Sequence, residues 1–382
     1  MSRILEIIET PTSFRSGIHY HRTLVPLKAL RSRGHSTREV AIGQSIPDEF
    51  MEYPSVVKFG RIYPEWSKPV EIMKSYQKQG KRCIYDIDDD FWYVDPANPS
   101  QGVSNVFKDQ YEGLMQQADA ITTPSPVLAK KMRKLVGNKK PIFICNNGID
   151  TEDYVERPHG NNQLVIGYMG ASSHWKDLKL ILPVINKLQE KHDFLFVIQG
   201  LTSVPLESDI YESRKALQLG LLPEKKEYLK DVSAIGDMLD TINLMHIPFY
   251  TPELHPHILS RANFDIGLAP LEDTEFNSAK SNIKFYEYAS VGTPTLASDV
   301  LPYKTEVTYR AKNTFKDWYD KLEKLIVDKD FREKLAKDQQ KWVLANRSLA
   351  NVALEWELAT QKESPMKTLN QQKGLLKRLL KK

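Results

Sequence analysis

Residues 264–299, FDIGLAPLEDTEFNSAKSNIKFYEYASVGTPTLASD, decide the fold of this chain. They begin with an apolar run of strand length, which a polar loop follows. A helix is predicted over 282–291, because Ser281 or Asn282 can cap its start and a Gly-Thr-Pro sequence then ends it. The apolar residues after that sequence form the next predicted strand. Strand, loop, helix and strand make a βαβ unit, whose loop opens at the carboxyl edge of a parallel sheet.

The predicted helix and its approach carry charged side chains at a regular spacing. Lys280, Lys284 and Glu287 stand at i, i+4 and i+7, which places them on one face of a helix. Two lysines beside the free amides of a helix start suit a phosphate group, and Glu287 can accept hydrogen bonds from sugar hydroxyls. These residues therefore predict a nucleotide-sugar site. The alternative interpretation is a solvated face of Lys–Glu pairs, and the spacing alone does not choose between them.

The composition is that of a soluble globular protein with two or three domains. The chain has 382 residues, of which 41% are hydrophobic and 27% charged. Its apolar runs are all shorter than the roughly 18 residues that a membrane span needs. Acidic residues interrupt the apolar start, which therefore predicts a first strand and not a signal peptide. The two cysteines, Cys83 and Cys145, are far apart in apolar runs, which predicts no disulfide framework, no zinc site and a reducing cytoplasm.

The net charge of +4 is unevenly distributed along the chain. Residues 362–382 contain seven Lys or Arg and one acid, a balance of +6, so the remainder of the chain carries −2. The body is therefore not a basic nucleic-acid binder. The amphipathic end, 374–382, can touch an anionic membrane or follow a nucleic-acid backbone, although a mobile chain end is the simpler interpretation.

Strand and helix signals alternate in both halves of the chain. This rhythm predicts α/β domains with doubly wound parallel sheets. One helix is expected from Lys176 through 188, and loops with one helix over 201–236. The predicted strands lie at 4–8, 39–42, 56–59, 83–87, 120–123, 142–146, 164–169, 194–198, 244–249, 264–271 and 295–298, and the last helices at 315–326, 331–344 and 349–359.

An acidic cluster follows a predicted strand in the run Tyr85–Trp92, YDIDDDFW. Its four aspartates cannot all be buried and ionised without partners, because each unpaired charge costs several kcal/mol. Functional interpretations are binding of sugar hydroxyls, general-base catalysis or binding of a divalent metal. The structural alternative is an acidic helix start capped by Asp88 or Asp89. The ring of Trp92 or Tyr93 can stack on a sugar or base, or simply pack in a core.

The loop after the first predicted strand of each half of the chain carries further candidate residues. In the first, Gly17 stands at the turn into a helix, where backbone can approach a ligand, and Arg22 can pair with phosphate. His19 is a candidate general base, although a structural histidine is the commoner case. In the second loop, Ser172, His174 and Lys176 occupy the matching place in the other half of the chain.

With these motifs in hand, the chain resembles the GT-B glycosyltransferases, in particular the large retaining class called family 4. The run EYASVGTPTLAS, 287–298, is similar to the nucleotide-sugar signature of that class, and FNSAKSNIK, 276–284, to a variant of bacterial and bacteriophage members. The motifs at 16–22 and 85–92, and Asn147–Asp150 before a linker, match further landmarks. The resemblance covers residues 3–360, and only the 287–298 signature is fairly specific.

The resemblance implies four segments. They are an acceptor-side Rossmann-like domain over 1–160, a donor-side one over 161–345 facing it across a cleft, a closing helix over 346–361 that crosses back, and the basic tail 362–382. A hexosyl or pentosyl group would be transferred from a UDP-linked or similar donor, with retention of configuration. Such enzymes usually need no metal, so the aspartates would face the acceptor or the sugar. One departure is Ala279, which stands where the class has a glutamate that binds the transferred sugar; Lys280 or Glu275 can substitute for it.

Residues and resemblance together assign the site. In this assignment Glu287 holds the ribose hydroxyls and amides near 281–283 the diphosphate. Catalytic roles are predicted for His19, Asp88, Asp89 and Lys280. Donor-binding roles are predicted for Gly17, Ser172, His174, Lys176, Tyr250, Lys280, Ser281, Asn282, Ile283, Lys284 and Glu287. Acceptor-binding roles are predicted for Arg22, Asp90, Trp92 and Tyr93.

The acceptor stays open at this level. A surface or lipid-linked glycan fits the bacterial resemblance and a tail that touches a membrane at the cytoplasmic face. A hydroxymethylated base of bacteriophage DNA, modified in the host cytoplasm, is the competing acceptor. A phosphatase or metal-dependent hydrolase built on the Asp86–Asp90 cluster is a more distant alternative, as is a non-catalytic binding protein.

Overall fold

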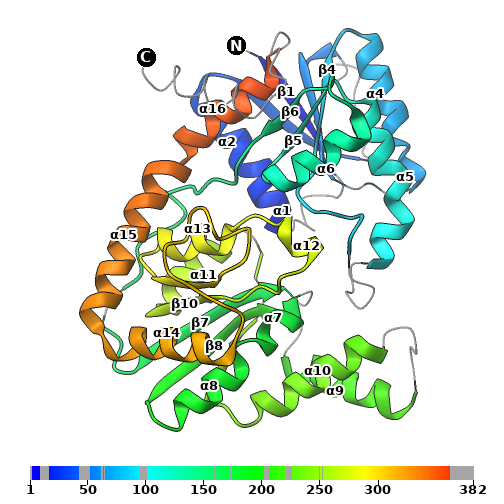
Figure 1. Ribbon diagram of the computed structural model, residues 1–382. Coiled ribbons are helices and arrows are strands. Elements are labelled where there is room, and N and C mark those ends of the chain that lie inside the picture. The colour runs from blue at the N-terminus through cyan, green and yellow to red at the C-terminus, as the bar shows by residue number, and fades with distance from the viewer. Residues whose placement is uncertain are drawn as a thin grey trace.

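The chain folds into two six-stranded parallel sheets, each between layers of helices (Figure 1). This confirms the predicted pair of doubly wound α/β domains, while the domain boundaries at 160 and 345 stay predictions. The computed structural model describes residues 2–8, 17–42, 52–61, 63, 65–94, 101–158, 160–171, 174–201, 206–220, 226–248, 250–251 and 253–361.

The first sheet has the strand order β2-β1-β3-β4-β5-β6, and all its neighbouring strands are parallel. Its strands are β1 (Arg3–Ile8), β2 (Ser36–Ala41), β3 (Val56–Phe59), β4 (Arg82–Asp86), β5 (Ala120–Thr123) and β6 (Ile142–Ile144). Its helical segments are α1 (Gly17–His19), η2 (Tyr20–Leu24), α2 (Val25–Ser32), η3 (Glu65–Ser67), α4 (Pro69–Lys78), α5 (Gln101–Gln117) and α6 (Pro126–Val136).

The second sheet has the order β12-β11-β10-β7-β8-β9 and is also parallel throughout. Both faces of its central strands are buried, as in other parallel sheets. Ile166 of β7 belongs to the core on one face, and Met169 to the core on the other. Its strands are β7 (Leu164–Ala171), β8 (Phe194–Leu201), β9 (Leu244–Ile247), β10 (Ile266–Ala269), β11 (Thr295–Ser298) and β12 (Arg310–Ala311).

Three helix predictions in this half were wrong in number. Two helices replace the single helix expected from Lys176, because the first one ends before Pro183 and the second begins with Pro183 in its first turn. The stretch 201–236 holds two helices instead of one, and the polar loop before Lys280 contains the short helix α12, capped by Thr274. These helices are α7 (Trp175–Lys179), α8 (Leu182–Gln189), α9 (Leu206–Gln218), α10 (Lys226–Leu239) and α12 (Glu275–Ser278); the others are α11 (His255–Ala262), α13 (Ile283–Ser290), α14 (Phe315–Val327), α15 (Lys329–Arg347) and α16 (Leu349–Thr360).

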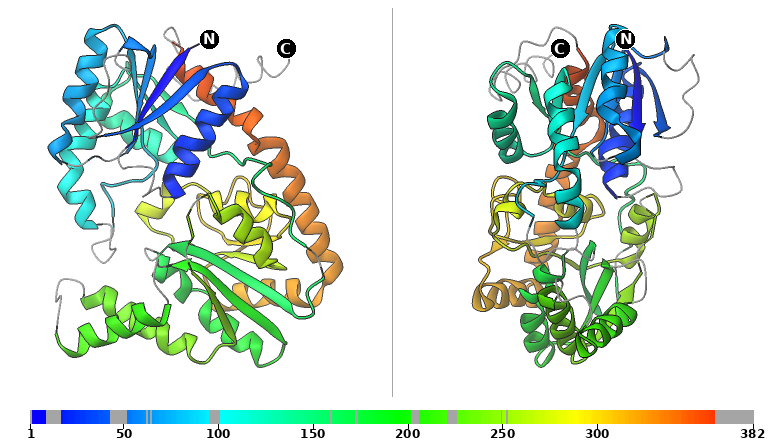
Figure 2. Two further views of the ribbon diagram at one scale, coloured as in Figure 1. Left: turned by 180° about the vertical axis from the view of Figure 1, so that it is seen from behind. Right: turned by 90° about the vertical axis from the view of Figure 1, so that its right-hand side faces the viewer.

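Helices α15 and α16 connect the second sheet back to the first (Figure 2). In Figure 1, α15 runs along one side of the molecule and α16 lies beside α2. Val352 and Trp356 of α16 are buried in one core with Ile4 and Ile84 of the first sheet. The linker passes the same junction, since Ile149 forms a parallel bridge with Ser348. The last helix therefore belongs structurally to the first domain.

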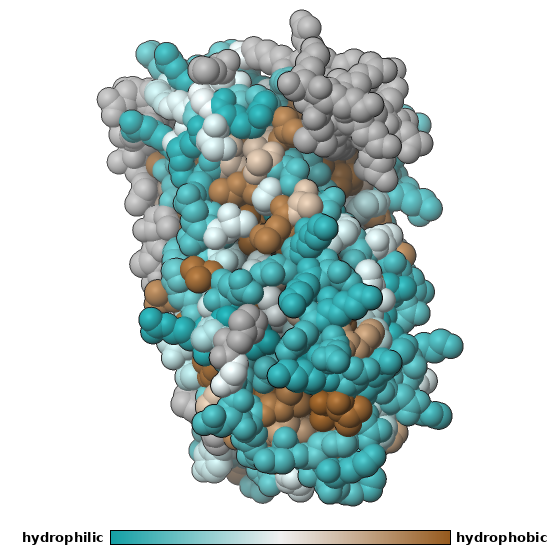
Figure 3. Space-filling view, turned by 90° about the vertical axis from the view of Figure 1, so that its left-hand side faces the viewer, coloured by the Kyte–Doolittle hydropathy of each residue, from teal (hydrophilic) through white to brown (hydrophobic). Residues whose placement is uncertain are grey.

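The surface seen in Figure 3 is predominantly hydrophilic, with hydrophobic residues gathered in small patches. None of the helices in the described part of the chain is both long and apolar enough to cross a membrane. The basic tail 362–382 lies outside the described residues, so its predicted membrane or DNA contact stays a prediction.

Candidate active site

Helix α13 lies close to the centre of the second sheet because of one glycine. A Cβ on Gly267 of β10 would lie 2.7 Å from the ring of Tyr288, so only glycine lets the helix approach this strand. The hydroxyl of Tyr288 accepts a hydrogen bond from the backbone N–H of Met169, at 2.9 Å. Gly292, at φ +79°, ends the helix as predicted. The start of α13 is thereby held near the carboxyl edge of β10.

The start of α13 has no side-chain cap. Asn282 occupies the N-cap position, as one prediction had it, but makes no capping hydrogen bond. Its Nδ2 instead donates to Glu306 Oε2 at 2.6 Å, and the neighbouring Ser281 Oγ accepts from Asn147 Nδ2 at 2.9 Å. The amides of Ile283 and Lys284 therefore present the positive end of the helix without a carboxylate or hydroxyl over it, which suits an anion.

Lys284 lies in the first turn of α13 without an anionic partner. No hydrogen-bond acceptor or carboxylate of the described residues lies within bonding distance of its ammonium, which sits 5.5 Å from the ring centroid of Tyr168. Burial lowers the pKa of Lys284 to about 8, an effect that Asp177 opposes and Lys280 strengthens. Lys284 is half-buried, and a cation partly removed from water without a partner is unfavourable, so this position favours an anionic ligand.

Glu287 lies one turn further along α13 and is buried. Its Oε1 is 2.9 Å from the hydroxyl of Tyr154, 3.1 Å from Nε2 of His21 and 3.2 Å from Nε2 of His255. Burial alone would raise the pKa of Glu287, but His255 and His21 outweigh it and hold that pKa well below its ordinary range. All these contacts are to Oε1, so among the described residues Oε2 carries no bond that competes with a ligand.

Lys280 is not on the helical face predicted for it, because α13 begins only at Ile283. It lies in the turn between α12 and α13, with its ammonium 4.6 Å from the ring centroid of Phe276 and 3.5 Å from Oδ1 of Asp89. Asp89 belongs to the first domain, so this ion pair joins the two domains. The preceding residue, Ala279, is fully buried in a core of the first domain and offers no polar group to a sugar.

The loop after β7 places a neutral histidine near these lysines. His174 Nδ1 lies 2.6 Å from Asp177 Oδ2. Burial lowers the pKa of His174 to about 4, and nearby Lys284 adds to this effect, while Asp177 opposes it. Lys176, in α7, is half-buried. Ser172 lies outside the described residues, so its predicted role stays a prediction.

The four aspartates after β4 are all matched by cations. Asp86 is buried and accepts two hydrogen bonds from Arg22, at 2.6 and 3.0 Å. Asp88 and Asp89 lie 3.5 and 3.4 Å from Arg61. The residues from 88 to 93 form no helix, so the alternative of an acidic helix start is wrong. No group of three His, Cys, Asp or Glu side chains in the described part of the chain comes together in an arrangement suited to a metal ion.

Asp88 and Asp89 differ in acidity although they are neighbours. Burial and the Asp89 charge raise the pKa of Asp88 to about 6. Burial opposes ionisation of Asp89 as well, but Lys280 and Arg61 outweigh it and lower the pKa of Asp89. A carboxylate with a pKa near 6 suits proton transfer near neutral pH, which keeps Asp88 a candidate catalytic residue.

Arg22, a predicted acceptor contact, is buried and hydrogen-bonded within the protein. Besides Asp86, its guanidinium donates to the carbonyl of Cys145 at 2.6 Å and to Asn147 Oδ1 at 3.0 Å. Its Cζ also lies 4.8 Å from the ring centroid of Trp356. These contacts hold Arg22 against Asp86, and its predicted role in acceptor binding stays a prediction.

The other predicted first-domain residues have mixed surroundings. Asp90 is buried against Lys131 of α6, and Lys131 also lies 2.6 Å from Glu275 of α12, which joins the domains a second time. Trp92 points inward and donates to Glu112 at 2.8 Å. Tyr93, in contrast, is 55% exposed. The roles of these residues in binding stay predictions.

Three further predicted residues lie apart from the contacts described above. Gly17 begins α1, where a Cβ would meet nothing within 4 Å, so packing within the protein does not require glycine there. Buried His19 has Nε2 3.4 Å from Glu39. Tyr250 follows β9 and is 38% exposed. Their roles in the site also stay predictions.

Comparison with known proteins agrees with this architecture. No protein-family model matches the chain. It is 23% identical over 236 residues to the "Putative teichuronic acid biosynthesis glycosyltransferase TuaH" of Bacillus subtilis (strain 168), which is 57% of this chain and 51% of that protein. The match therefore spans about half the length of that relative.

Solved structures match almost the whole chain at low identity. Anabaena Alr3699/HepE in complex with UDP-glucose has a TM-score of 0.63 at 12% identity, covering 94% of this chain and 98% of that one. Sucrose-phosphate synthase from Thermosynechococcus elongatus has 0.61 at 12%, covering 100% and 99%. An alpha-glucosyltransferase in complex with UDP-glucose and DNA containing an abasic site has 0.63 at 12%, covering 94% and 99%.

The chain has the GT-B fold. The resemblance drawn from the 276–298 motifs is thereby confirmed at the level of architecture. In this GT-B chain the start of α13 and the end of β4 lie on opposite sides of the domain interface and meet through Lys280 and Asp89.

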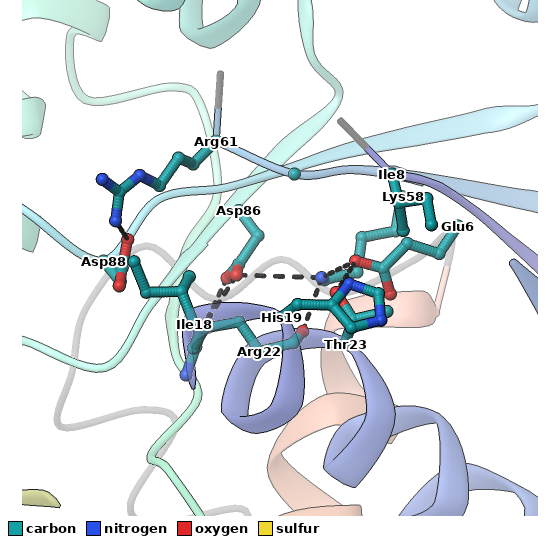
Figure 4. Close-up of a pocket in the computed structure, with 11 residues that line it drawn as sticks. Glu6, Ile8, Ile18, His19, Arg22, Thr23, Lys58, Arg61, Asp86 and Asp88 are labelled. Atoms are coloured by element: carbon teal, nitrogen blue, oxygen red, sulfur yellow. Dashed lines mark hydrogen bonds and ion pairs between the residues drawn. The ribbon is translucent and has the colours of Figure 1, made fainter. Parts of the chain in front are cut away.

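Sequence reasoning missed several residues of the GT-B interface. Each is a single polar residue in an otherwise ordinary stretch, so no local pattern marks it. His21 comes into contact with Glu287 only through the packing of the two domains. The missed residues are His21, Tyr154 and His255 at Glu287, Arg61 and Lys131 at the aspartates, and Glu6 and Lys58 in a pocket of the first domain (Figure 4).

Proposed function

We propose that this GT-B chain is a glycosyltransferase that transfers a sugar from a UDP-sugar to a hydroxyl group of a glycan. The observation that carries the proposal is Lys284, a half-buried cation without an anionic partner in the described residues, at the uncapped start of α13. A diphosphate supplies the missing negative charge, and the backbone amides of the helix start supply hydrogen-bond donors.

The nucleoside part of the donor is assigned to Glu287. Its ionised carboxylate is fixed by Tyr154 and two histidines through Oε1, which leaves Oε2 to accept from the two ribose hydroxyls. Two structural neighbours, HepE and an alpha-glucosyltransferase, are in complex with UDP-glucose. These complexes support UDP as the nucleotide of this chain, while Ala279 leaves the identity of the sugar to experiment.

The transfer step follows from the charges at the helix start. The bond between the anomeric carbon and the phosphate oxygen breaks, and negative charge develops on the diphosphate. Lys284 and the α13 amides stabilise this charge, with Lys280 nearby. The acceptor oxygen bonds to the anomeric carbon on the same face, its proton passes to the departing phosphate oxygen, and UDP leaves. Configuration is retained, and the residues of this chain hold the reactants without a metal in this scheme.

Asp88 and Asp89 are assigned to the acceptor side of this step. Asp89 is joined to Lys280 and so lies next to the donor domain. Asp88, whose pKa is raised to about 6, can accept a hydrogen bond from the attacking hydroxyl near neutral pH. This interaction orients the acceptor oxygen for attack.

A glycan is the proposed acceptor, in keeping with the relative TuaH, the "Putative teichuronic acid biosynthesis glycosyltransferase". The second candidate is a hydroxymethylated base in DNA, which the structural match to an alpha-glucosyltransferase bound to DNA favours. Both acceptors present a hydroxyl group, so the donor site is the same in either case.

The proposal is tested by incubating the protein with a panel of UDP-sugars and measuring UDP release. We expect slow hydrolysis of one donor, faster release when a glycan acceptor is added, and loss of both in Lys284→Met. Absence of UDP release with every donor would contradict the proposal. Magnesium-dependent phosphate release from p-nitrophenyl phosphate under the same conditions would instead support the phosphatase alternative.

A further inference from the structure

A small polar pocket opens at the carboxyl edge of the first sheet (Figure 4). Strands β1, β3 and β4 supply its floor, and the helical turn at 18–23 supplies one wall. Its charged lining residues are Glu6, His19, Arg22, Lys58, Arg61, Asp86 and Asp88. The function proposed above uses only Asp88 of this set, so the pocket requires its own explanation.

The cations of this pocket are already neutralised by carboxylates. Figure 4 shows the Lys58 ammonium between the carboxylates of Asp86 and Glu6, and it lies 3.7 Å from Asp86 Oδ2. The Lys58 ammonium also donates to the carbonyl of Arg22 at 2.7 Å. Arg22 pairs with Asp86 through two hydrogen bonds, and Arg61 lies beside Asp88. A phosphate or other anion entering the pocket would meet three carboxylates and displace existing ion pairs.

One oxygen in the pocket lacks a hydrogen-bond donor. Glu6 is fully buried, and its Oε1 accepts from Lys58 and, at 2.7 Å, from the hydroxyl of Thr23. Its Oε2 has no hydrogen-bond partner among the described residues. A buried carboxylate oxygen without a donor is unfavourable, and it marks the place where a ligand can contribute an O–H group.

A hydroxyl group fits Glu6 in either protonation state. Burial raises the pKa of Glu6, although Lys58 and Thr23 oppose this shift. An ionised Glu6 needs a donor at Oε2, and a protonated one needs an acceptor there. Because a hydroxyl both donates and accepts, it satisfies each state, whereas an ammonium group or a phosphate satisfies only one.

The pocket also lies beside the proposed site of transfer. Asp88 lines it, and the next residue, Asp89, contacts Lys280 of the donor domain at 3.5 Å. A sugar that places one hydroxyl in the pocket can therefore present another at Asp88. On the other side, Trp356 of α16 closes the charged cluster, with the Lys58 ammonium 5.1 Å from its ring centroid.

We propose that this pocket is the acceptor-recognition site and that it binds a hydroxyl group of a neutral, polyhydroxylated acceptor through Glu6. This inference rests on the function proposed above and deepens it, because it assigns the acceptor class as an uncharged sugar. The balanced charges of the lining argue against a nucleic-acid backbone, which needs uncompensated Lys and Arg side chains.

The first test measures binding without the donor. Saturation-transfer NMR with methyl glycosides of glucose, galactose and N-acetylglucosamine should detect binding to the wild-type protein, about tenfold weaker or more in Glu6→Gln. Glu355→Gln is the matched control, because Glu355 is a half-buried, hydrogen-bonded carboxylate packed against the same domain outside the pocket, and it should bind as the wild type does. Absence of binding to the wild type, or equal binding by Glu6→Gln and wild type, would overturn the proposal.

The second test measures transfer. In Glu6→Gln the acceptor KM should rise about tenfold or more, while the donor KM and the rate of UDP-sugar hydrolysis change less than twofold. Parallel loss of hydrolysis would show a structural role instead and overturn the proposal. If Glu6→Gln does not fold, Asp88→Asn, on a partly exposed residue of the same pocket, should raise the acceptor KM in the same way; an unchanged acceptor KM would overturn the proposal.

The third test separates acceptor classes and the two proposals. Transfer to duplex DNA containing hydroxymethylcytosine, with none to any glycoside, would overturn the pocket assignment while leaving the donor site intact. Failure of the wild type to release UDP from any UDP-sugar would refute the proposed function. Glycoside binding lost in Glu6→Gln would still support the pocket in that case, so the two failures are distinguishable.

Discussion

The two sides of the domain interface differ in whether their cations are paired with carboxylates. On the first-domain side, the cations around the acidic end of β4 are matched by carboxylates, as Arg22 of η2 is by Asp86 and Lys131 of α6 by Asp90. On the second-domain side, Lys284 is half-buried at a helix start without such a partner in the described chain. The difference indicates that the second domain is suited to bind an anionic ligand. The charges of the first domain at this interface are already balanced by ion pairs. This is the charge distribution that a UDP-sugar donor and a sugar acceptor require.

Among the proposed variants, Lys284→Met is expected to have the largest effect on activity, because it removes the unpaired cation from the second-domain side. Removing the cation should lower kcat/KM for the donor by about 10²–10³, since it stabilises charge that develops on the leaving diphosphate. The fold should persist, because a half-buried charge without an ionic partner is replaced by an apolar side chain of similar volume. UDP release and thermal unfolding measure the two effects.

The control for this variant is Lys316→Met, on an 84% exposed side chain of α14. It should behave as the wild type in both measurements. A Lys284→Met protein with unchanged kcat/KM would place the phosphate elsewhere.

A smaller effect is expected from Glu287→Gln. Donor affinity should fall about tenfold, because hydrogen bonds to a charged oxygen are worth about 1.5–3 kcal/mol. The melting temperature should fall as well, since His21 and His255 lose their ionised partner. Calorimetric titration with UDP and thermal unfolding provide the measurements.

Glu323→Gln is a matched control for this variant. Glu323 also accepts from a histidine, His192, at 2.9 Å, but lies on the surface of the second domain. Its substitution should leave UDP affinity unchanged. Equal affinities of Glu287→Gln and wild type would remove Glu287 from the donor site.

The contrast is also expected to depend on pH. The pKa of Lys284 is lowered to about 8, so Lys284 is charged below that pH and neutral above it. Donor KM should therefore rise as the pH increases from 7 to 9, and Lys284→Met should lose most of this dependence. The folded protein without ligand should gain stability from about pH 8 to the ordinary lysine pKa, because the unfolded chain binds more protons in that window.

Initial rates over this pH range, with saturating acceptor, measure the change in donor KM. A donor KM that is constant from pH 7 to 9 in the wild type would mean that Lys284 does not titrate against the donor.

The smallest effect on activity is expected from Lys131→Met on the first-domain side. This change leaves Asp90 buried without its cation and should lower the free energy of unfolding by about 2–4 kcal/mol. Donor KM should change less than twofold, because Lys131 is already neutralised. Denaturant unfolding and donor kinetics check both parts, and a tenfold rise in donor KM would show that the first domain also binds the phosphate.

The architecture could be predicted from the sequence because the positions of strands and helices depend on local patterns of residues. The strands at 56–59, 120–123 and 295–298 were located to the residue, and the end of α13 followed from Gly292. The short helix α12 was missed because Thr274 caps it within a polar loop, where a cap resembles any other loop residue. Segment 201–236 was mispredicted in the number of its helices because its apolar spacing is irregular.

The candidate site was predictable only where one short segment carries it. Lys284 and Glu287 share a helix, and their spacing places them one turn apart. The pairing of Arg22 with Asp86 was not predicted because the two residues lie 64 positions apart in the chain, and burial of the pair cannot be read from either stretch. The meeting of His21 and His255 on Glu287 depends in the same way on the packing of two domains.

The most direct test of the contrast between the two sides is a calorimetric titration of UDP into three proteins. The Kd of Lys284→Met should exceed that of the wild type by about 30-fold or more, the equivalent of about 2 kcal/mol. The Kd of Lys131→Met should stay within twofold of the wild type. Equal losses in both variants, or none in Lys284→Met, would contradict the claim that the second domain alone is prepared for the anionic donor.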